Sequence, residues 1–147
     1  MSKPTPAAKF VIGIDLGTTN SALAYASAIA GEREQPPVMQ FEIPQLVNPN
    51  EVREEPLLPS SLYLHGPADF PAGSLALPWN PEPEFVAGVL AAKRGIESSA
   101  RLVSSAKSWL SHSGVDRTAS ILPVTAPDGV KKISPVEASS RYLEHLR

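Results

Sequence analysis

KFVIGIDLGTTNSALAYASA is the stretch of sequence from residue 9 to residue 28. Within it, Phe10, Ile12 and Ile14 alternate with their neighbours, and the segment Gly-Thr-Thr-Asn follows at residues 17–20. Alternation with a period of two is typical of a β-strand, and a polar segment that contains glycine is typical of a turn. The stretch therefore predicts a β-hairpin.

The turn of this hairpin carries residue types that suit phosphate binding. Asp15 stands at the end of the apolar strand, and Gly17 lets the backbone approach a ligand closely. Consecutive backbone N–H groups at such a turn bind anions, and Thr18 and Thr19 add hydroxyl donors. A carboxylate beside a phosphate needs a cation between them, which makes Asp15 a candidate ligand of Mg²⁺. The alternative is an ordinary hairpin whose Asp and Thr side chains cap the turn locally.

The composition narrows the classes of protein to consider. The 147 residues are 42% hydrophobic and 19% charged, which predicts one globular core. The net charge is −2 and basic residues cluster only in pairs, so we expect no nucleic acid and no membrane as partners. A cytoplasmic location is expected, and the absence of cysteine excludes disulfides and thiol chemistry. The polar, proline-containing residues 1–8 are expected to form a disordered N-terminus.

Proline dominates the middle of the chain. Eleven of the 16 prolines fall between Pro36 and Pro83, which excludes long helices there. Within this Pro-rich insert, strand-favouring residues lie between breakers in the segments 38–43, 60–65 and 75–79. We expect an irregular insert with short β-strands, and the alternative is a solvent-exposed linker.

The rest of the sequence predicts short strands and helices. Residues 85–95 favour a strand that runs into a helix, and the apolar residues from 102 to 110 recur at helical spacing. Residues 121–125 and 130–133 flank a Pro-Asp-Gly turn, which predicts a second hairpin.

A last helix is predicted to begin at Pro135. The segment Ser134-Pro135-Val136-Glu137 combines an N-cap serine, a proline at the first helical position and a glutamate at the third. The apolar stripe of this helix continues to the end of the sequence, and no Gly, Asn or Pro closes it. We therefore expect the sequence to be a fragment of a longer chain.

These motifs, taken in order, resemble one family. IGIDLGTTNS, residues 12–21, is similar to the first phosphate-binding loop of the DnaK-type, seventy-kilodalton heat-shock chaperones, and more loosely to the DxG turn of the actin and sugar-kinase ATPase fold. Four later segments resemble further landmarks of the family in the same order. They are LPSSLYL (58–64), the AG and AKR segments (87–94), SAK (105–107) and SPVE (134–137). The resemblance covers nearly the whole chain but only about the first quarter of a full-length member.

The resemblance implies a fold and a set of site residues. The fold would be α/β: the N-terminal part of an actin-like, ribonuclease-H-like ATPase fold. Residues 9–147 would form lobe I only of the nucleotide-binding domain, with β-hairpins, short helices and the Pro-rich insert 36–83. Asp15 would organise the Mg²⁺ shell, through water, and Lys107 would reach the γ-phosphate and the attacking water, so both are candidate catalytic residues. The residues implied to bind the phosphates of ATP or ADP are Gly17, Thr18, Thr19 and Asn20.

The family's activity is ATP hydrolysis coupled to protein folding, with unfolded polypeptide clients and co-chaperones as partners of the remainder of the parent. This chain departs from the pattern after Lys107, where Ser108-Trp109-Leu110-Ser111 replaces the family's Arg-Leu-x-Gly. It also has no counterpart of the second phosphate loop or the adenosine pocket, so alone it would hold half of an active site. Two alternatives stay open: a small-molecule kinase of the same fold, and a non-catalytic interaction module.

Overall fold

The computed structural model describes residues 8–29, 35–126 and 128–147, so nearly all of the expected disordered segment 1–8 lies outside the described residues. The fold is mixed α/β, with small antiparallel sheets and a few helices. The strands are β1 (Phe10–Leu16), β2 (Asn20–Ser27), β3 (Met39–Gln40), β4 (Ile43–Asn48), β5 (Glu51–Glu55), β6 (Leu58–Pro59), β7 (Ser61–Tyr63), β8 (Val86–Ala87) and β9 (Leu102–Ser104). The helices are α1 (Val89–Glu97), α2 (Ala106–Leu110) and α3 (Pro135–Leu146), with a 3-10 turn at Ser99–Arg101.

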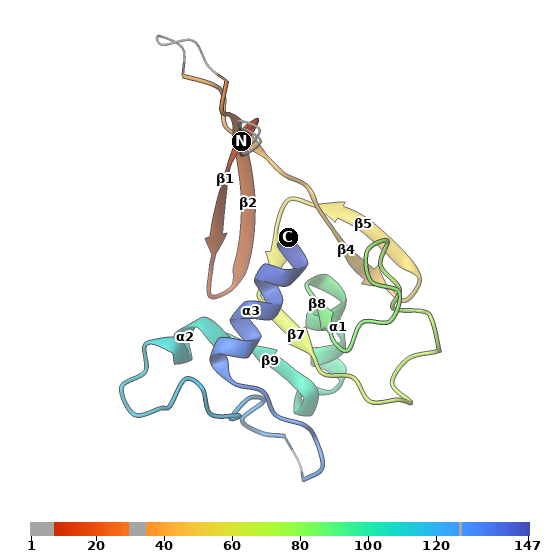
Figure 1. The fold of residues 1–147 in the computed structure, drawn as a ribbon. Coiled ribbons are helices and arrows are strands. Elements are labelled where there is room, and N and C mark those ends of the chain that lie inside the picture. Colours follow the sequence, from red (N-terminus) through yellow and green to blue (C-terminus); the bar gives the residue numbers. More distant parts are fainter. Residues whose placement is uncertain (1–7, 30–34, 127) are drawn as a thin grey trace, which may run out of the picture.

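The predicted hairpin at residues 9–28 is confirmed. β1 and β2 pair antiparallel without a break, from Phe10 opposite Ser27 to Leu16 opposite Ser21. Figure 1 shows this hairpin along one side of the molecule. β3 pairs with the middle of β2, and β6 pairs with its first residues, so that Asn20 lies opposite Pro59. The turn between β1 and β2 is thereby attached to the Pro-rich insert.

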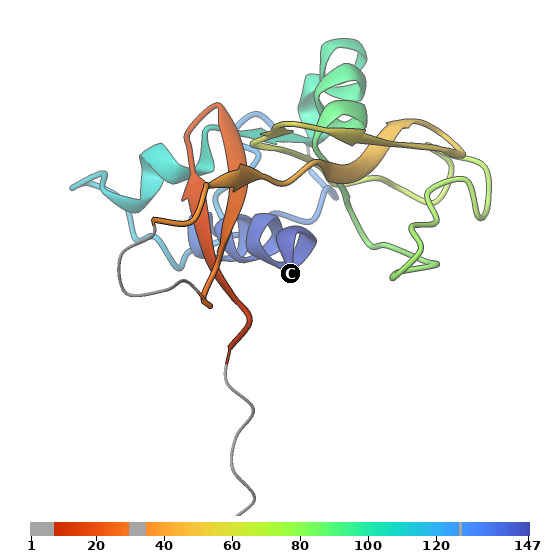
Figure 2. The ribbon, with the colours of Figure 1, turned by 90° about the horizontal axis from the view of Figure 1, so that it is seen from above.

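The centre of the fold is the three-stranded sheet β8-β7-β9. Successive residues of β7 point to opposite faces, because side chains alternate along a strand. Leu62 packs in a core cluster with Tyr142 of α3, whereas Tyr63 packs in a second cluster with Leu90 of α1. α1 and α3 therefore cover opposite faces of this sheet, as Figure 2 shows.

The start of α3 follows the sequence prediction. The Ser134 side chain accepts a hydrogen bond from the N–H of Glu137 at 3.0 Å, and Pro135 is the first helical residue. The carboxylate of Glu137 pairs with Arg141, one turn along the helix. The predicted strand and helix at residues 85–95 are likewise present, as β8 and α1.

The Pro-rich insert is partly as predicted. The segment 60–65 holds β7, and the segment 38–43 holds the two residues of β3 and Ile43, the first residue of β4. The third prediction is wrong, because residues 75–79 form turns and Pro78 leaves only an isolated bridge between Leu77 and Asn80. The antiparallel pair β4-β5 was not predicted.

Two predictions for the C-terminal half are corrected. Residues 102–104 form β9 instead of the first turn of a helix, because they pair with β7 and bury Val103. The helix begins only after Ser105, whose φ of 53° lies in the left-handed region. The second hairpin is reduced to a single bridge between Leu122 and Ile133 in the described residues, and Pro127 lies outside them. None of the described helices is long and apolar enough to cross a membrane.

Candidate functional site

The candidate site is the turn between β1 and β2, residues 17–19. Gly17 is needed here on steric grounds, since a Cβ at this position would collide with the carbonyl oxygen of Asn20. By contrast, a Cβ on Gly13, in the same hairpin, would meet nothing within 4 Å. The two glycines of the hairpin thus differ in role: Gly17, within the turn, permits its tight conformation, and Gly13, on β1, does not constrain it.

Ser60 holds this turn from the side. Its hydroxyl donates to the carbonyl oxygen of Gly17 at 2.8 Å, and its backbone N–H donates to the carbonyl oxygen of Thr19 at 2.8 Å. The same hydroxyl lies 3.1 Å from the hydroxyl of Ser21. Ser60 is 3% exposed, so the Ser60 end of these bonds is buried, whereas Gly17 and Thr19 are more exposed. Ser60 lies within the segment LPSSLYL, but no local sequence signal marks it as a site residue.

The turn has spare donors and few spare acceptors. The carbonyl groups of Gly17 and Thr19 are both engaged by Ser60. The backbone N–H groups of Gly17, Thr18 and Thr19 have no acceptor among the described residues, and both threonines are exposed. A surface with free N–H groups and occupied carbonyls favours an anion over a cation. The arrangement therefore suits a phosphate group.

Asp15 is the acidic residue nearest to the turn. It is exposed on β1 opposite Ala22, and its side chain points to the face opposite that of Leu16, which packs against the core. The described residues contain no group of three or more His, Cys, Asp or Glu side chains that could hold a metal ion. Mg²⁺ commonly binds through one or two carboxylates together with water and substrate phosphates. Asp15 thus fits a magnesium ion that is shared with a bound phosphate.

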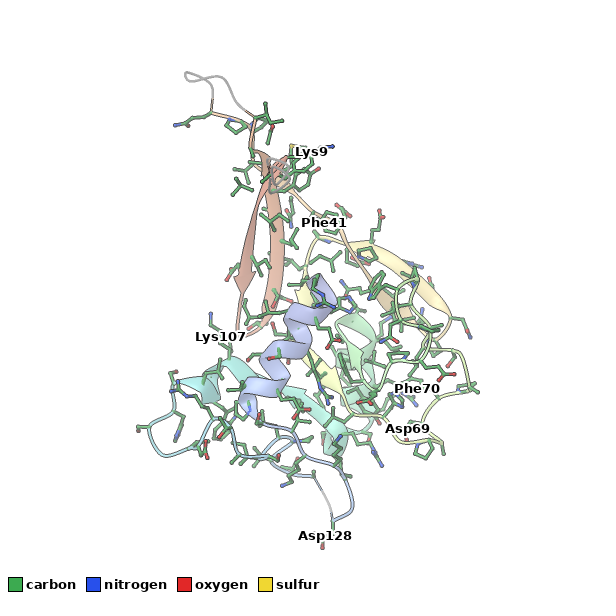
Figure 3. All side chains as sticks on the ribbon, in the orientation of Figure 1. Lys9, Phe41, Asp69, Phe70, Lys107 and Asp128 are labelled. Atoms are coloured by element: carbon green, nitrogen blue, oxygen red, sulfur yellow. The ribbon has the colours of Figure 1, made fainter. Side chains whose placement is uncertain are left out.

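Lys107 comes from a separate element. It is the second residue of α2 and is exposed, whereas its neighbour Ala106 is 1% exposed. Leu16, at the turn end of β1, packs against the same core cluster as Ala106, so α2 lies at that end of the hairpin. Figure 3 shows Lys107 at this place. Within the described ranges, Lys107 forms no ion pair and no hydrogen bond with the turn.

The structure therefore brings the predicted site residues together in part. Residues 15–20 are contiguous on the hairpin, and Asn20 is exposed beside the turn. Lys107 lies at the same end of the fold and forms no described hydrogen bond or ion pair with them. A cavity of about 590 Å³ lies elsewhere, between β4 and the end of α3, and includes Trp79 and His145 but none of the predicted site residues.

Comparisons of the chain with protein-family models, with curated proteins and with solved structures find no match.

Proposed function

We propose that this chain is the N-terminal part of a DnaK-type chaperone ATPase and that residues 15–20 form one half of its ATP site. The observation that carries the proposal is the turn of residues 17–19, with three N–H groups that lack described acceptors and two carbonyls engaged by Ser60. Such a turn is suited to the phosphates of ATP or ADP.

The proposal assigns a role to each residue of the site. The N–H groups of residues 17–19, with the hydroxyls of Thr18 and Thr19 and the nearby Asn20, bind phosphate oxygens. Asp15 binds the water shell of the Mg²⁺ that accompanies the nucleotide, which offsets the repulsion between its carboxylate and the phosphates. Lys107 neutralises charge on the γ-phosphate once the site is closed by further polypeptide.

Exposed apolar residues on β1 support the view that the site is incomplete in this chain. Phe10, Val11, Ile12 and Ile14 are between 47% and 63% exposed. These residues lie on both faces of the strand, because neighbours in a strand point in opposite directions. A strand that is apolar on both faces is typical of the interior of a sheet with both faces covered. In the proposed actin-like fold, further strands and helices of the parent chain cover β1, and residues 9–147 make up lobe I.

The chaperone activity belongs to the parent chain under this proposal. ATP hydrolysis there drives the capture and release of unfolded polypeptide clients, with co-chaperones as further partners. The alternative of a non-catalytic, phosphate-binding module is favoured by one observation, namely that Lys107 forms no described hydrogen bond or ion pair with the turn. The two functions agree on the phosphate site and differ on hydrolysis.

The phosphate site is tested by titrating the 147-residue chain with Mg²⁺ and ADP while recording backbone amide resonances. We expect the amide resonances of Gly17, Thr18 and Thr19 to shift in a saturable manner. The variant Gly17→Ala should lose this response, since its Cβ displaces the turn, whereas the matched variant Gly13→Ala should retain it. The proposal fails if the turn resonances do not respond, or if Gly17→Ala binds as well as Gly13→Ala.

A further inference from the structure

We propose that helix α3 regulates the phosphate-binding turn through the hydroxyl of Tyr142 and the backbone of Ser60, an inference that rests on the proposed function. The Tyr142 hydroxyl donates to the carbonyl oxygen of Ser60 at 2.9 Å, and the two residues are 82 positions apart in the sequence. Tyr142 is therefore a positioning residue, since it acts on the turn only through Ser60.

The linkage consists of hydrogen bonds that converge on one residue. Ser60 receives the Tyr142 bond at its carbonyl oxygen, and it donates from its N–H and its hydroxyl to Thr19 and Gly17. Tyr142 is 2% exposed and Ser60 is 3% exposed. Hydrogen bonds in such dry surroundings are stronger than those at the surface, and losing one leaves a buried carbonyl without a donor. A change at Tyr142 therefore reaches the two carbonyls that fix the turn.

Burial also keeps the phenol in its donating form. It raises the pKa of Tyr142 far above its ordinary value, so the hydroxyl retains its proton throughout the physiological range. The bond to Ser60 consequently responds to the position of α3 and not to pH.

The rest of α3 is attached to other parts of the fold. In its first turn the N–H of Val136 donates a hydrogen bond to the carbonyl oxygen of Arg117, and near its end the His145 ring lies 3.0 Å from the carbonyl oxygen of Pro44 in β4. In the described part of the chain, Tyr142 provides the one hydrogen bond between α3 and the segment that holds the turn. Loss of this bond would remove the hydrogen bond by which α3 positions Ser60, the residue whose N–H and hydroxyl hold the turn.

The test compares Tyr142→Phe with Tyr63→Phe in the 147-residue chain. Each substitution removes only a hydroxyl from a buried tyrosine, since Tyr63 is 3% exposed, but Tyr63 packs in the cluster on the α1 face. Two readouts are recorded: hydrogen exchange of the Ser60 amide in the nucleotide-free chain, and the affinity for ADP with Mg²⁺. For Tyr142→Phe we expect about tenfold faster exchange of the Ser60 amide and about three- to tenfold weaker ADP binding, as the loss of one buried hydrogen bond implies. Tyr63→Phe should change neither.

The outcomes separate the inference from the function on which it rests. Unchanged exchange at Ser60 in Tyr142→Phe, or ADP binding equal to that of the unsubstituted chain, overturns the role of Tyr142 alone. Failure of the unsubstituted chain to bind ADP overturns the proposed function and the regulation together.

A second pair of variants covers the case in which Tyr142→Phe does not fold. Ser60→Ala removes the hydrogen bond to the carbonyl oxygen of Gly17. Ser74→Ala removes a comparable bond far from the turn in sequence, because Ser74 is 1% exposed and its hydroxyl donates to the carbonyl oxygen of Pro71 at 2.7 Å. Weaker ADP binding in Ser60→Ala than in Ser74→Ala supports the linkage. Equal affinity overturns it.

Discussion

The N–H of Val89 donates a hydrogen bond to the side-chain oxygen of Gln45 at 3.0 Å, which joins the first residue of α1 to β4. The amide nitrogen of the same Gln45 side chain donates to the carbonyl oxygen of Leu57 at 2.9 Å. Gln45 is 0% exposed. One buried glutamine thus caps a helix that has no side-chain cap of its own at Gly88 and also supports the segment that leads into β6.

Replacement of Gln45 by leucine should destabilise the protein. The substitution leaves the Val89 N–H and the Leu57 carbonyl, both in part-buried hydrogen bonds, without their partner, so we expect the free energy of unfolding to fall by about 1–2 kcal/mol. The matched variant is Gln40→Leu, because Gln40 also donates to a backbone carbonyl, that of Pro56, but is exposed. Urea unfolding of both variants checks the prediction, and equal losses would contradict it.

Gly88→Ala should be more damaging than its backbone conformation alone explains. Gly88 has a φ of 79°, which disfavours any other residue, and its added Cβ would also collide with the side-chain oxygen of Gln45. Gly129 has a φ of 88° but open space around its Cβ, so Gly129→Ala isolates the conformational cost of about 1–2 kcal/mol. The added Cβ would also lie 2.7 Å from the Leu58 side chain, so we expect a larger loss for Gly88→Ala in thermal or urea unfolding. Equal losses would mean that the close contacts with Gln45 and Leu58 cost no free energy.

The sequence predicted those elements whose signals are local. The β1-β2 hairpin follows from alternation and a glycine turn, and the start of α3 at Ser134 follows from its capping residues. The helix predicted from residue 102 was wrong at its start, because pairing with β7 outweighs helical spacing in a three-residue segment. Tertiary pairing of this kind has no local sequence signal.

The same division applies to the candidate site. The residues of the turn itself, 15–20, were selected from their own types and order. Ser60 and Tyr142 were not, because their roles arise from hydrogen bonds between segments that are far apart in the sequence. Lys107 was also predicted as a site residue, but a sequence does not show whether the side chain of a residue on one element reaches a turn on another.

Stability should depend on pH through His145. Burial lowers the pKa of this histidine below its ordinary value of 6.5, and the hydrogen bond with the Pro44 carbonyl opposes that effect. Because the folded-state pKa is depressed, the unfolded chain takes up the proton first as the pH falls. The contribution to stability is therefore fully present above pH 6.5 and is lost as the pH falls toward the folded-state pKa.

Urea unfolding between about pH 7.5 and about pH 5 measures this dependence, and carboxylates contribute little in that range. His145→Gln should flatten the decrease in the free energy of unfolding as the pH is lowered. His112→Gln alters an exposed histidine and should leave the decrease intact. If the free energy of unfolding of His145→Gln still decreases as the pH is lowered, the decrease is due to another titratable group.

Lys107→Ala distinguishes an ATPase from a non-catalytic phosphate-binding module. The side chain is exposed and forms no described ion pair, so the thermal unfolding midpoint should not change. If Lys107 stabilises charge that develops on the γ-phosphate, single-turnover ATP hydrolysis by the proposed parent chain should fall by about 100-fold or more. Nucleotide affinity should stay within about threefold, since the phosphates are bound mainly by the turn.

Lys131→Ala, at another exposed lysine, controls for the loss of a positive charge and should hydrolyse ATP normally. Hydrolysis that is unchanged in Lys107→Ala removes Lys107 from the site and leaves residues 15–20 as a site that binds phosphate without a lysine from α2.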